Sequence, residues 1–281
     1  MRIDLHTHSL VSDGTDAPAQ LVRNAASAGL DVIALTDHDT FDGIDEAKAA
    51  AQASGIGLLA GLEFSTQRAG ASVHLLAYGC DPSEPALRDE LAKVREGRNG
   101  RVPGMVARLT ELGMPITIED VFAQAGGSSL GRPHIADALV AKGYLPSRDA
   151  AFRDWLYEGG PAYVDRYCTE LTRAIALVRQ AYGVAVLAHP WARGRRDDLP
   201  EEFLADLVAH GLDGIEVDHP DHDADTREAL RGIAGRLGLL ATGSSDHHGL
   251  GKVNNPLGAC LTDPEVYAEI VRRIHARGGC A

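Results

Sequence analysis

The sequence predicts an α/β barrel with a helical insertion. Short apolar runs alternate with segments of helical period on both sides of the middle of the chain, which is typical of a parallel sheet. In addition, His, Asp and Glu residues lie at or just past the carboxyl ends of several different predicted strands. These ends share one mouth in a closed parallel barrel, whereas an open sheet places its ligands mainly at one crevice.

Apolar segments with the length and composition of strands are expected at residues 2–8, 32–36, 56–64, 72–78, 184–188, 213–218, 239–243 and, as a short one, 257–261. Helices are expected between them. The first begins near Asp16 and Pro18 and ends at Gly29. A later helix is expected to bury one apolar stripe, formed by Leu230, Ile233, Ala234 and Leu237.

The alternation stops in the middle of the chain. Residues 97–167, called the insertion from here on, have the pattern of helices near 102–112, 118–125, 134–142 and 148–157. Helices placed between two barrel strands suggest a lid or specificity domain above the strand ends. We therefore expect a barrel formed by residues 1–96 plus 168–281, with the insertion as its second part.

The charge of the chain argues against duplex nucleic acid as a partner. Its 281 residues suit one barrel with an insertion, and they carry a formal net charge of -13. A long basic groove for duplex nucleic acid is therefore not expected. Acidic and basic residues balance in the insertion, so the barrel carries the negative excess, part of which unfilled metal sites would explain.

The sequence also predicts a cytoplasmic protein without a membrane segment. No apolar run reaches the roughly 18 residues of a membrane span, and the first residues lack the pattern of a signal peptide. Cys80, Cys168, Cys260 and Cys280 are scattered without CxxC spacing, which indicates free thiols. No glycine-rich phosphate loop follows the first strand, and no aromatic pattern of an RNA-binding platform is present. The oligomeric state stays open.

Residue types that bind metal ions recur along the chain. His6 and His8 are two apart on the first predicted strand, so their side chains point to the same face and can chelate one ion. Related contexts follow at Ser-Asp13-Gly, Thr-Asp37-His38-Asp39, Leu-Glu63-Phe, Val-His74-Leu, Ala-His189-Pro and Ser-Asp246-His247-His248-Gly. Nitrogen and oxygen ligands without thiolate fit Mn, Fe or Zn and do not decide among them.

The order of these motifs resembles that of the polymerase and histidinol phosphatase (PHP) domain family, from residue 1 to about residue 262. Within it, the chain looks most like the branch with a helical insertion. That branch includes enzymes that remove phosphate from 3',5'-bisphosphorylated nucleotides and enzymes that degrade short RNA. The resemblance implies a distorted barrel of seven strand–helix units that holds two to three divalent ions, of which manganese is expected first.

The resemblance also implies how nine ligands divide among three ions. One ion would take His6, His8, Glu63 and Asp246. A second would take Glu63, His74 and His189, so that Glu63 bridges the pair. A third would take Asp13, His38 and His248. A bridged pair of ions can share one hydroxide, which attacks phosphorus in line with the leaving oxygen.

Five residues are candidates for contact with the substrate or for proton transfer. Arg132 and His134, at a predicted helix start, would bring positive charge from the insertion, although capping of the helix is an equal explanation for His134. His219 follows the sixth predicted long strand and faces the same mouth. Asp246 or His189 could give a proton to the leaving alkoxide.

These residues favour a metal-dependent phosphoesterase that acts on a small phosphorylated nucleotide or a short oligonucleotide. The resemblance implies hydrolysis of the 3'-phosphate of 3',5'-nucleotide bisphosphates first, and of the 5' ends of short oligoribonucleotides second. Within the family, histidinol phosphate is the alternative substrate. A barrel amidohydrolase is an alternative of another class, but such sites commonly bridge metals with a modified lysine on the fourth strand, where this chain has His74. A non-catalytic module of the kind carried by DNA polymerases is a further alternative, and the full set of ligands argues against it.

Overall fold

A computed structural model describes residues 1–125, 130–192 and 196–280. Their backbone forms one sheet of eight strands: β1 (Ile3–Thr7), β2 (Val32–Leu35), β3 (Gly57–Arg68), β4 (Ala71–Tyr78), β5 (Thr169–Glu170), β6 (Val184–Leu187), β7 (Gly214–Asp218) and β8 (Leu240–Gly243). Seven strands follow the order β1-β2-β3-β4-β6-β7-β8, and the short β5 pairs with β3. The sheet curves until Thr7 of β1 pairs with His247, beyond the end of β8, so the barrel is nearly closed.

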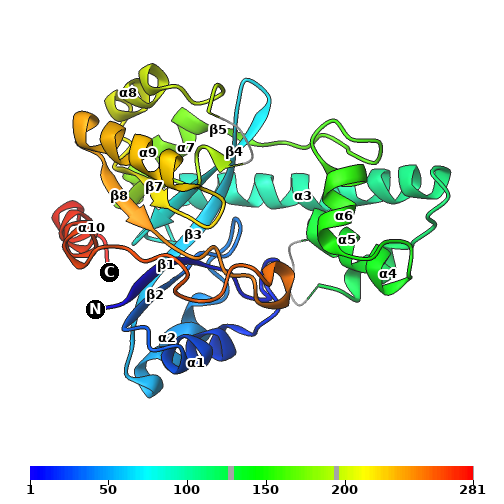
Figure 1. Cartoon of the computed structure of the whole chain (residues 1–281), viewed down its shortest axis with the longest axis horizontal. Coiled ribbons are helices and arrows are strands. Elements are labelled where there is room, and N and C mark those ends of the chain that lie inside the picture. The colour runs from blue at the N-terminus through cyan, green and yellow to red at the C-terminus, as the bar shows by residue number, and fades with distance from the viewer. Residues whose placement is uncertain (126–129, 193–195, 281) are drawn as a thin grey trace.

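Helices surround this sheet (Figure 1). The barrel helices are α1 (Pro18–Ser27), α2 (Ile44–Ser54), α7 (Leu171–Gln180), α8 (Glu201–Ala209), α9 (Ala224–Leu237) and α10 (Pro264–Arg277). The insertion contains α4 (Ile118–Phe122), α5 (Arg132–Ala141), α6 (Arg148–Ala151) and the π-helix η1 (Phe152–Leu156). The structure thus confirms the predicted barrel with a helical insertion.

The long helix α3 (Pro85–Glu111) connects the two parts. We expected a helix to begin near residue 102, but α3 begins at Pro85, where the side chain of Glu84 accepts a hydrogen bond from the N–H of Leu87. It crosses residue 97 without a break, even though Pro103 lies inside it. Figure 1 shows α3 running from the barrel to the insertion helices at its far end.

The prediction of a parallel sheet is wrong at β4. This strand is antiparallel to both of its neighbours, β3 and β6. The cause is a two-residue turn, because Ala69 and Gly70 have φ angles of 49° and 86° and so join β3 and β4 as a hairpin. Residues 257–261, predicted as a short strand, form none. The N–H of Gly258 donates to Asp4 instead of joining a strand ladder.

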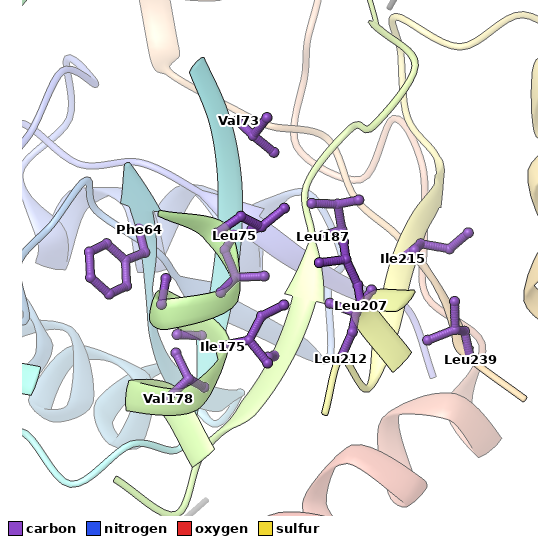
Figure 2. Packing of buried hydrophobic residues seen from close by; sticks show 14 of the residues in the cluster. Phe64, Val73, Leu75, Ile175, Val178, Leu187, Leu207, Leu212, Ile215 and Leu239 are labelled. Carbon is purple, nitrogen blue, oxygen red and sulfur yellow. The ribbon is translucent and has the colours of Figure 1, made fainter. Parts of the chain in front are cut away.

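Barrel and insertion have separate hydrophobic cores. The largest barrel core joins the sheet to α7 (Figure 2) and includes Phe64, Leu75, Ile175, Val178, Leu187 and Ile215. The insertion core includes Val102, Met105, Leu109, Ile135, Leu139 and Leu156. Full burial of one such side chain stabilises the fold by roughly 1.5–3 kcal/mol. Among the described residues, no helix is both long and apolar enough to cross a membrane.

Candidate metal centre

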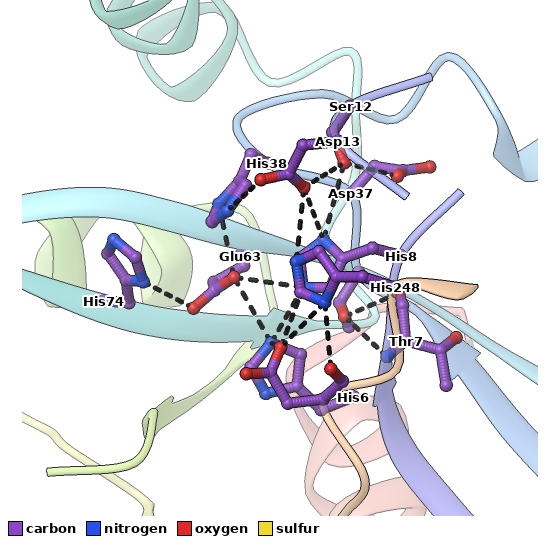
Figure 3. Close-up of polar contacts among 12 residues, drawn as sticks. His6, Thr7, His8, Ser12, Asp13, Asp37, His38, Glu63, His74 and His248 are labelled. Atoms are coloured by element: carbon purple, nitrogen blue, oxygen red, sulfur yellow. Dashed lines mark hydrogen bonds and ion pairs between the residues drawn. The ribbon is translucent and has the colours of Figure 1, made fainter. Parts of the chain in front are cut away.

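The nine residues proposed as ligands lie close together at one end of the barrel. Figure 3 shows the arrangement of His6, His8, Asp13, His38, Glu63, His74 and His248. Three of the candidate ligands lie within strands of the sheet. His6 lies in β1, Glu63 in β3 and His74 in β4. His189 and Asp246 follow β6 and β8, and both have positive φ angles, of 27° and 52°. Such backbone strain persists where surrounding contacts hold it, and it is common at functional sites.

Glu63 is the residue that links most of these side chains. Its Oε1 lies 2.7 Å from Nδ1 of His74 and 3.1 Å from Nε2 of His189. Its Oε2 lies 3.2 Å from Nε2 of His6 and 3.1 Å from Nε2 of His8. A carboxylate whose two oxygens face different imidazoles can bridge two cations.

A second carboxylate, Asp13, lies between two further histidines. Its Oδ2 is 3.5 Å from Nε2 of His38, and its Oδ1 is 3.3 Å from Nε2 of His248. His8 also approaches, with Nδ1 3.7 Å from Oδ1 of Asp13. Because Nδ1 of His38 lies 3.2 Å from Oε2 of Glu63, this Asp13 cluster (Asp13, His38, His248 and His8) is continuous with the rest of the centre.

Asp246 has two oxygens in different surroundings. Its Oδ1 lies 3.5 Å from Nε2 of both His6 and His8, so it faces the other candidate ligands. Its Oδ2 pairs with Lys252 and lies 3.4 Å from Nε2 of His219. Lys252 belongs to the short helix η3 (Gly249–Lys252), which in the sequence does not directly follow a strand. Motif spacing therefore did not place it in the predicted site.

Ligand atoms within 4.8 Å of one another define four groups in the described part of the chain: His8 with Asp13, His38 and His248; His6 with Glu63 and His189; His6 with His8 and Asp246; and His38 with Glu63 and His74. All nine predicted ligands therefore take part in at least one group. The grouping differs from the expected one in several respects. His8 joins Asp13, His38 and His248, and Glu63 is not grouped with His8 and Asp246. His74 and His189 face the same oxygen of Glu63 but belong to separate groups.

The charges of this centre suit divalent cations. Burial raises the pKa of Glu63, but the nearby His74, His38 and His6 outweigh it and lower the pKa well below the ordinary value. The pKa of His8 rises to about 9, because hydrogen bonds to Asp246 and Glu63 outweigh burial. A buried carboxylate that stays ionised among imidazoles can hold metal cations in place of the protons on those rings.

Unsatisfied buried atoms provide a direct test of whether ions fit. Buried polar atoms in proteins nearly always have a partner. Yet Nδ1 of His38, Nδ1 of His74 and Oδ1 of Asp246 are buried without a hydrogen bond of proper geometry. All three atoms face Glu63 or the histidines around it. Nitrogen and oxygen donors with these free lone pairs fit divalent metal ions.

Two of the candidate ligands are more open to solvent than the others. The side chains of His74 and His189 are 24% and 22% exposed, whereas that of His6 is fully buried. Substrate would therefore reach the centre on the side of His74 and His189.

Glu216 supports the centre from behind, and sequence reasoning missed this role. Its Oε1 lies 3.2 Å from Nδ1 of His6 and also accepts from the hydroxyl of Ser244, while its Oε2 accepts from the N–H of His189 at 2.8 Å. Burial raises its pKa, but His6 and His219 outweigh burial and lower it to about 2. An ionised carboxylate behind a histidine fixes the ring so that the opposite nitrogen can bind a metal. The available signal was Glu216 itself, a charged residue in an apolar predicted strand.

The candidate substrate residues from the insertion occupy two different places. Nδ1 of His134 accepts a hydrogen bond from the N–H of Gly131 at 3.0 Å, as expected from the capping alternative. Arg132 lies over the rings of Phe152 and Tyr163 and lines a cavity of about 370 Å³. His219 is fully buried between Asp246 and the ring of His189.

Two further arginines line the same cavity, and sequence reasoning missed both. This arginine cavity is lined by Gln67, Gly70, Ser72, Arg101, Arg132, Glu158, Tyr163, Asp165, Arg166 and Cys168. Burial and the nearby Arg132 and Arg166 lower the pKa of Arg101 to about 8. Nε of Arg101 is buried without a hydrogen-bond partner. Clustered, desolvated arginines of this kind attract an anion.

The protein is thus an α/β barrel with a cluster of His, Asp and Glu side chains at one end, which could hold metal ions. Residues 4–86 match the family model of the PHP domain. A 3',5'-nucleoside bisphosphate phosphatase from Chromobacterium violaceum is 35% identical over 276 residues, which are 98% of this chain and 97% of that protein. A 5'-3' exoribonuclease from Haemophilus influenzae is 33% identical over 88% of this chain and 90% of its own length. The chain belongs to the PHP domain family.

Solved structures agree with the fold. One solved structure is that of a protein from Bifidobacterium adolescentis, which was assigned by inference as a metal-dependent phosphoesterase. It superposes on this chain with a TM-score of 0.92 at 42% identity, over 96% of both chains. An amidohydrolase from Chromobacterium violaceum, solved with bound sulfate, has a TM-score of 0.89 at 35% identity, over 99% of this chain and 97% of its own.

Proposed function

We propose that this protein is a metal-dependent phosphoesterase that removes the 3'-phosphate from 3',5'-nucleoside bisphosphates. The observation that carries the proposal is the position of Glu63, whose two oxygens face different sets of histidines. The similar phosphatase, which is aligned over almost the whole chain, supports the choice of substrate.

Two to three divalent ions, with manganese the first choice, would bind through the nine ligands of the centre. When bound, such ions supply an activated water at neutral pH and Lewis acidity toward phosphoryl oxygens. The chain's own residues prepare this chemistry. Glu63 divides the centre into two sides, and Glu216 fixes His6 and the backbone of His189.

The arginine cavity supports recognition of a second phosphate. Ser72 lines this cavity, and His74 lies two residues further along β4 at the centre. Residues two apart on a strand share a face and are separated by about 7 Å. A nucleotide with two phosphates on one ribose can therefore present one to the centre and the other to Arg101, Arg132 and Arg166. Burial and repulsion from Arg132 and Arg166 lower the pKa of Arg101, and the second phosphate would relieve this repulsion.

Two groups remain candidates for the proton that the leaving alkoxide needs. His189 lies on the more open side of the centre, where its backbone is fixed by Glu216. Asp246 is buried, and its Oδ2 is already paired with Lys252. The exposure of His189 and the pairing of Asp246 support His189 over Asp246 as the proton donor, a role that requires His189 to be free of an ion during that step.

A related activity on short RNA is the second candidate. The arginine cavity, about 370 Å³ in volume, could hold the 5'-phosphate of an oligonucleotide as well as that of a mononucleotide. The similar exoribonuclease supports this possibility. Histidinol phosphate would present one phosphate only and leave the arginines without an anion.

An amidohydrolase reaction has less support. Sites of that class commonly bridge metals with a modified lysine on the fourth strand, and β4 carries His74 at the centre. Lys252 reaches the centre from η3, where it pairs with the outer oxygen of Asp246.

Phosphate release from purified protein tests the proposal. The panel should contain a 3',5'-bisphosphate, a 5'-mononucleotide, histidinol phosphate and di- to pentanucleotides, each with added manganese and with chelator. We expect the highest kcat/KM on the bisphosphate and loss of activity with chelator. Absence of phosphate release from every substrate with manganese, iron and zinc would reject the function.

A further inference from the structure

The guanidinium of Arg148 lies where three parts of the chain meet. Arg148 begins helix α6 of the insertion, and its side chain is 15% exposed. Its Nε donates to Oδ1 of Asp137 at 2.8 Å, and its Nη2 donates to Oδ2 of the same carboxylate. This paired contact fixes the plane of the guanidinium against helix α5.

The third nitrogen of this guanidinium reaches the barrel. Nη1 of Arg148 donates to the main-chain carbonyl of Asp13 at 3.3 Å. The carboxylate of the same Asp13 points the other way, to His38 and His248. Arg148 therefore binds the backbone of Asp13, whereas the side chain of Asp13 belongs to the Asp13 cluster.

The loop that follows His248 is held in the same place. A side chain at Gly251 would collide with the guanidinium of Arg148, so the two are in close contact. The N–H of Leu250 donates to the hydroxyl of Thr15 at 2.9 Å, which ties this loop to the one that carries Asp13. Both loops supply residues of the Asp13 cluster, and Arg148 lies against both.

From these contacts we infer that Arg148 is a positioning residue that couples docking of the insertion to divalent-cation binding in the Asp13 cluster. The inference rests on the proposed function, because it requires that this cluster binds an ion. Side chains that hold a ligand from behind typically change metal affinity by about 10- to 100-fold when they are replaced. Coupling of this kind is reciprocal, so a bound ion should also hold the insertion in place.

Manganese titration of the metal-free protein, followed by calorimetry and by electron paramagnetic resonance, tests the first half. Arg148→Met should weaken the weakest class of manganese sites by about 10- to 100-fold. Arg148→Lys keeps one donor and should restore part of the loss. Gly251→Ala, which changes no charge, should displace the guanidinium and weaken the same sites. Asp137→Asn removes the ionised partner of Arg148 and should act in the same direction.

Arg153 offers a matched control, because it lies in the same part of the insertion, is 70% exposed and pairs with the adjacent Asp154. Arg153→Met should bind manganese as the unchanged protein does. Equal affinities in Arg148→Met and the unchanged protein would overturn the inference, and so would equal losses in the Arg148 and Arg153 variants. If the unchanged protein itself binds no manganese, the proposed function fails instead.

Hydrogen exchange tests the reciprocal half and separates coupling from a merely structural role. Manganese should slow amide exchange in α5 and α6 of the unchanged protein and of Arg153→Met. In Arg148→Met, which should keep the thermal midpoint of the metal-free protein, the same addition should leave exchange in these helices unchanged. Manganese-dependent protection that persists in Arg148→Met would exclude Arg148 as the connection.

Discussion

Glu216 lies behind His6, with its Oε1 3.2 Å from Nδ1 of the ring, while Nε2 of the same ring faces Glu63 at 3.2 Å. The carboxylate thus decides which nitrogen of His6 is free to bind a metal. Because Glu216 also accepts from the N–H of His189, one buried side chain orients two candidate ligands, one in β1 and one just after β6.

We therefore expect Glu216→Gln to lower metal affinity by about 10- to 100-fold and turnover with it. The amide has nearly the same shape but can present an N–H to His6 and reverse the preferred tautomer. Bound manganese, measured after dialysis, checks the effect, and excess manganese should recover part of the rate. Glu201→Gln, at a surface pair with Arg236, is the control. Normal metal content in Glu216→Gln would contradict this role.

Protein prepared with excess manganese should contain two to three ions per chain, because nine candidate ligands exceed the needs of one hexacoordinate ion. His6→Asn and Asp246→Asn should each abolish turnover. Elemental analysis and circular dichroism check the metal content and the fold. A stoichiometry below one in active enzyme, or normal activity after loss of a ligand, would exclude the arrangement.

Arg132→Ala should reduce kcat/KM on a 3',5'-bisphosphate by about 10- to 100-fold, since a charge-assisted hydrogen bond contributes roughly 1.5–3 kcal/mol. The loss should be smaller on a monophosphate, which has no second phosphate for the arginine cavity. Metal content should stay normal. Arg88→Ala, on the exposed surface of α3, is the control. Equal losses on both substrates would place Arg132 at the reacting phosphate.

Cys80 should be unreactive in the folded protein. It is buried, and burial raises the pKa of its thiol from 9.0 to about 12. A thiol reagent at pH 8 should modify the exposed Cys280 first and Cys80 only after unfolding.

The raised pKa of Cys80 also makes the free energy of unfolding depend on pH. Above pH 9 the unfolded chain loses this proton and the folded chain keeps it, so the free energy of unfolding falls as pH rises. Rapid labelling of Cys80 in the native state would contradict both expectations.

Sequence patterns predicted most of the barrel because its strands are short apolar runs with clear ends. β1, β2, β6, β7 and β8 all lie within or close to their predicted bounds. The reversed direction of β4 was missed because Ala69 occupies a turn position that glycine or asparagine normally fills. The two-residue β5 is too short for any periodic signal.

Motif spacing found the candidate ligands because each follows or lies within a predicted strand. The arginine cavity could not be found in that way. Arg101 and Arg166 come from opposite ends of the insertion, and only packing brings them beside Arg132. Lys252 likewise reaches the centre through a tertiary contact that no local pattern encodes, whereas Glu216 could have been noticed as a charged residue within an apolar strand.

The uninterrupted course of α3 sets a strict limit on how this chain can change in length. Arg98 donates to Asp39 of the barrel, and Arg101, one turn later on the same helix face, lines the arginine cavity. Deleting a single residue between Glu90 and Arg98 would rotate everything beyond it by about 100° and draw it back by about 1.5 Å. Insertions and deletions in related chains should therefore accumulate beyond Glu111 and be rare within α3, because the length of this helix sets the distance and rotation between barrel and insertion.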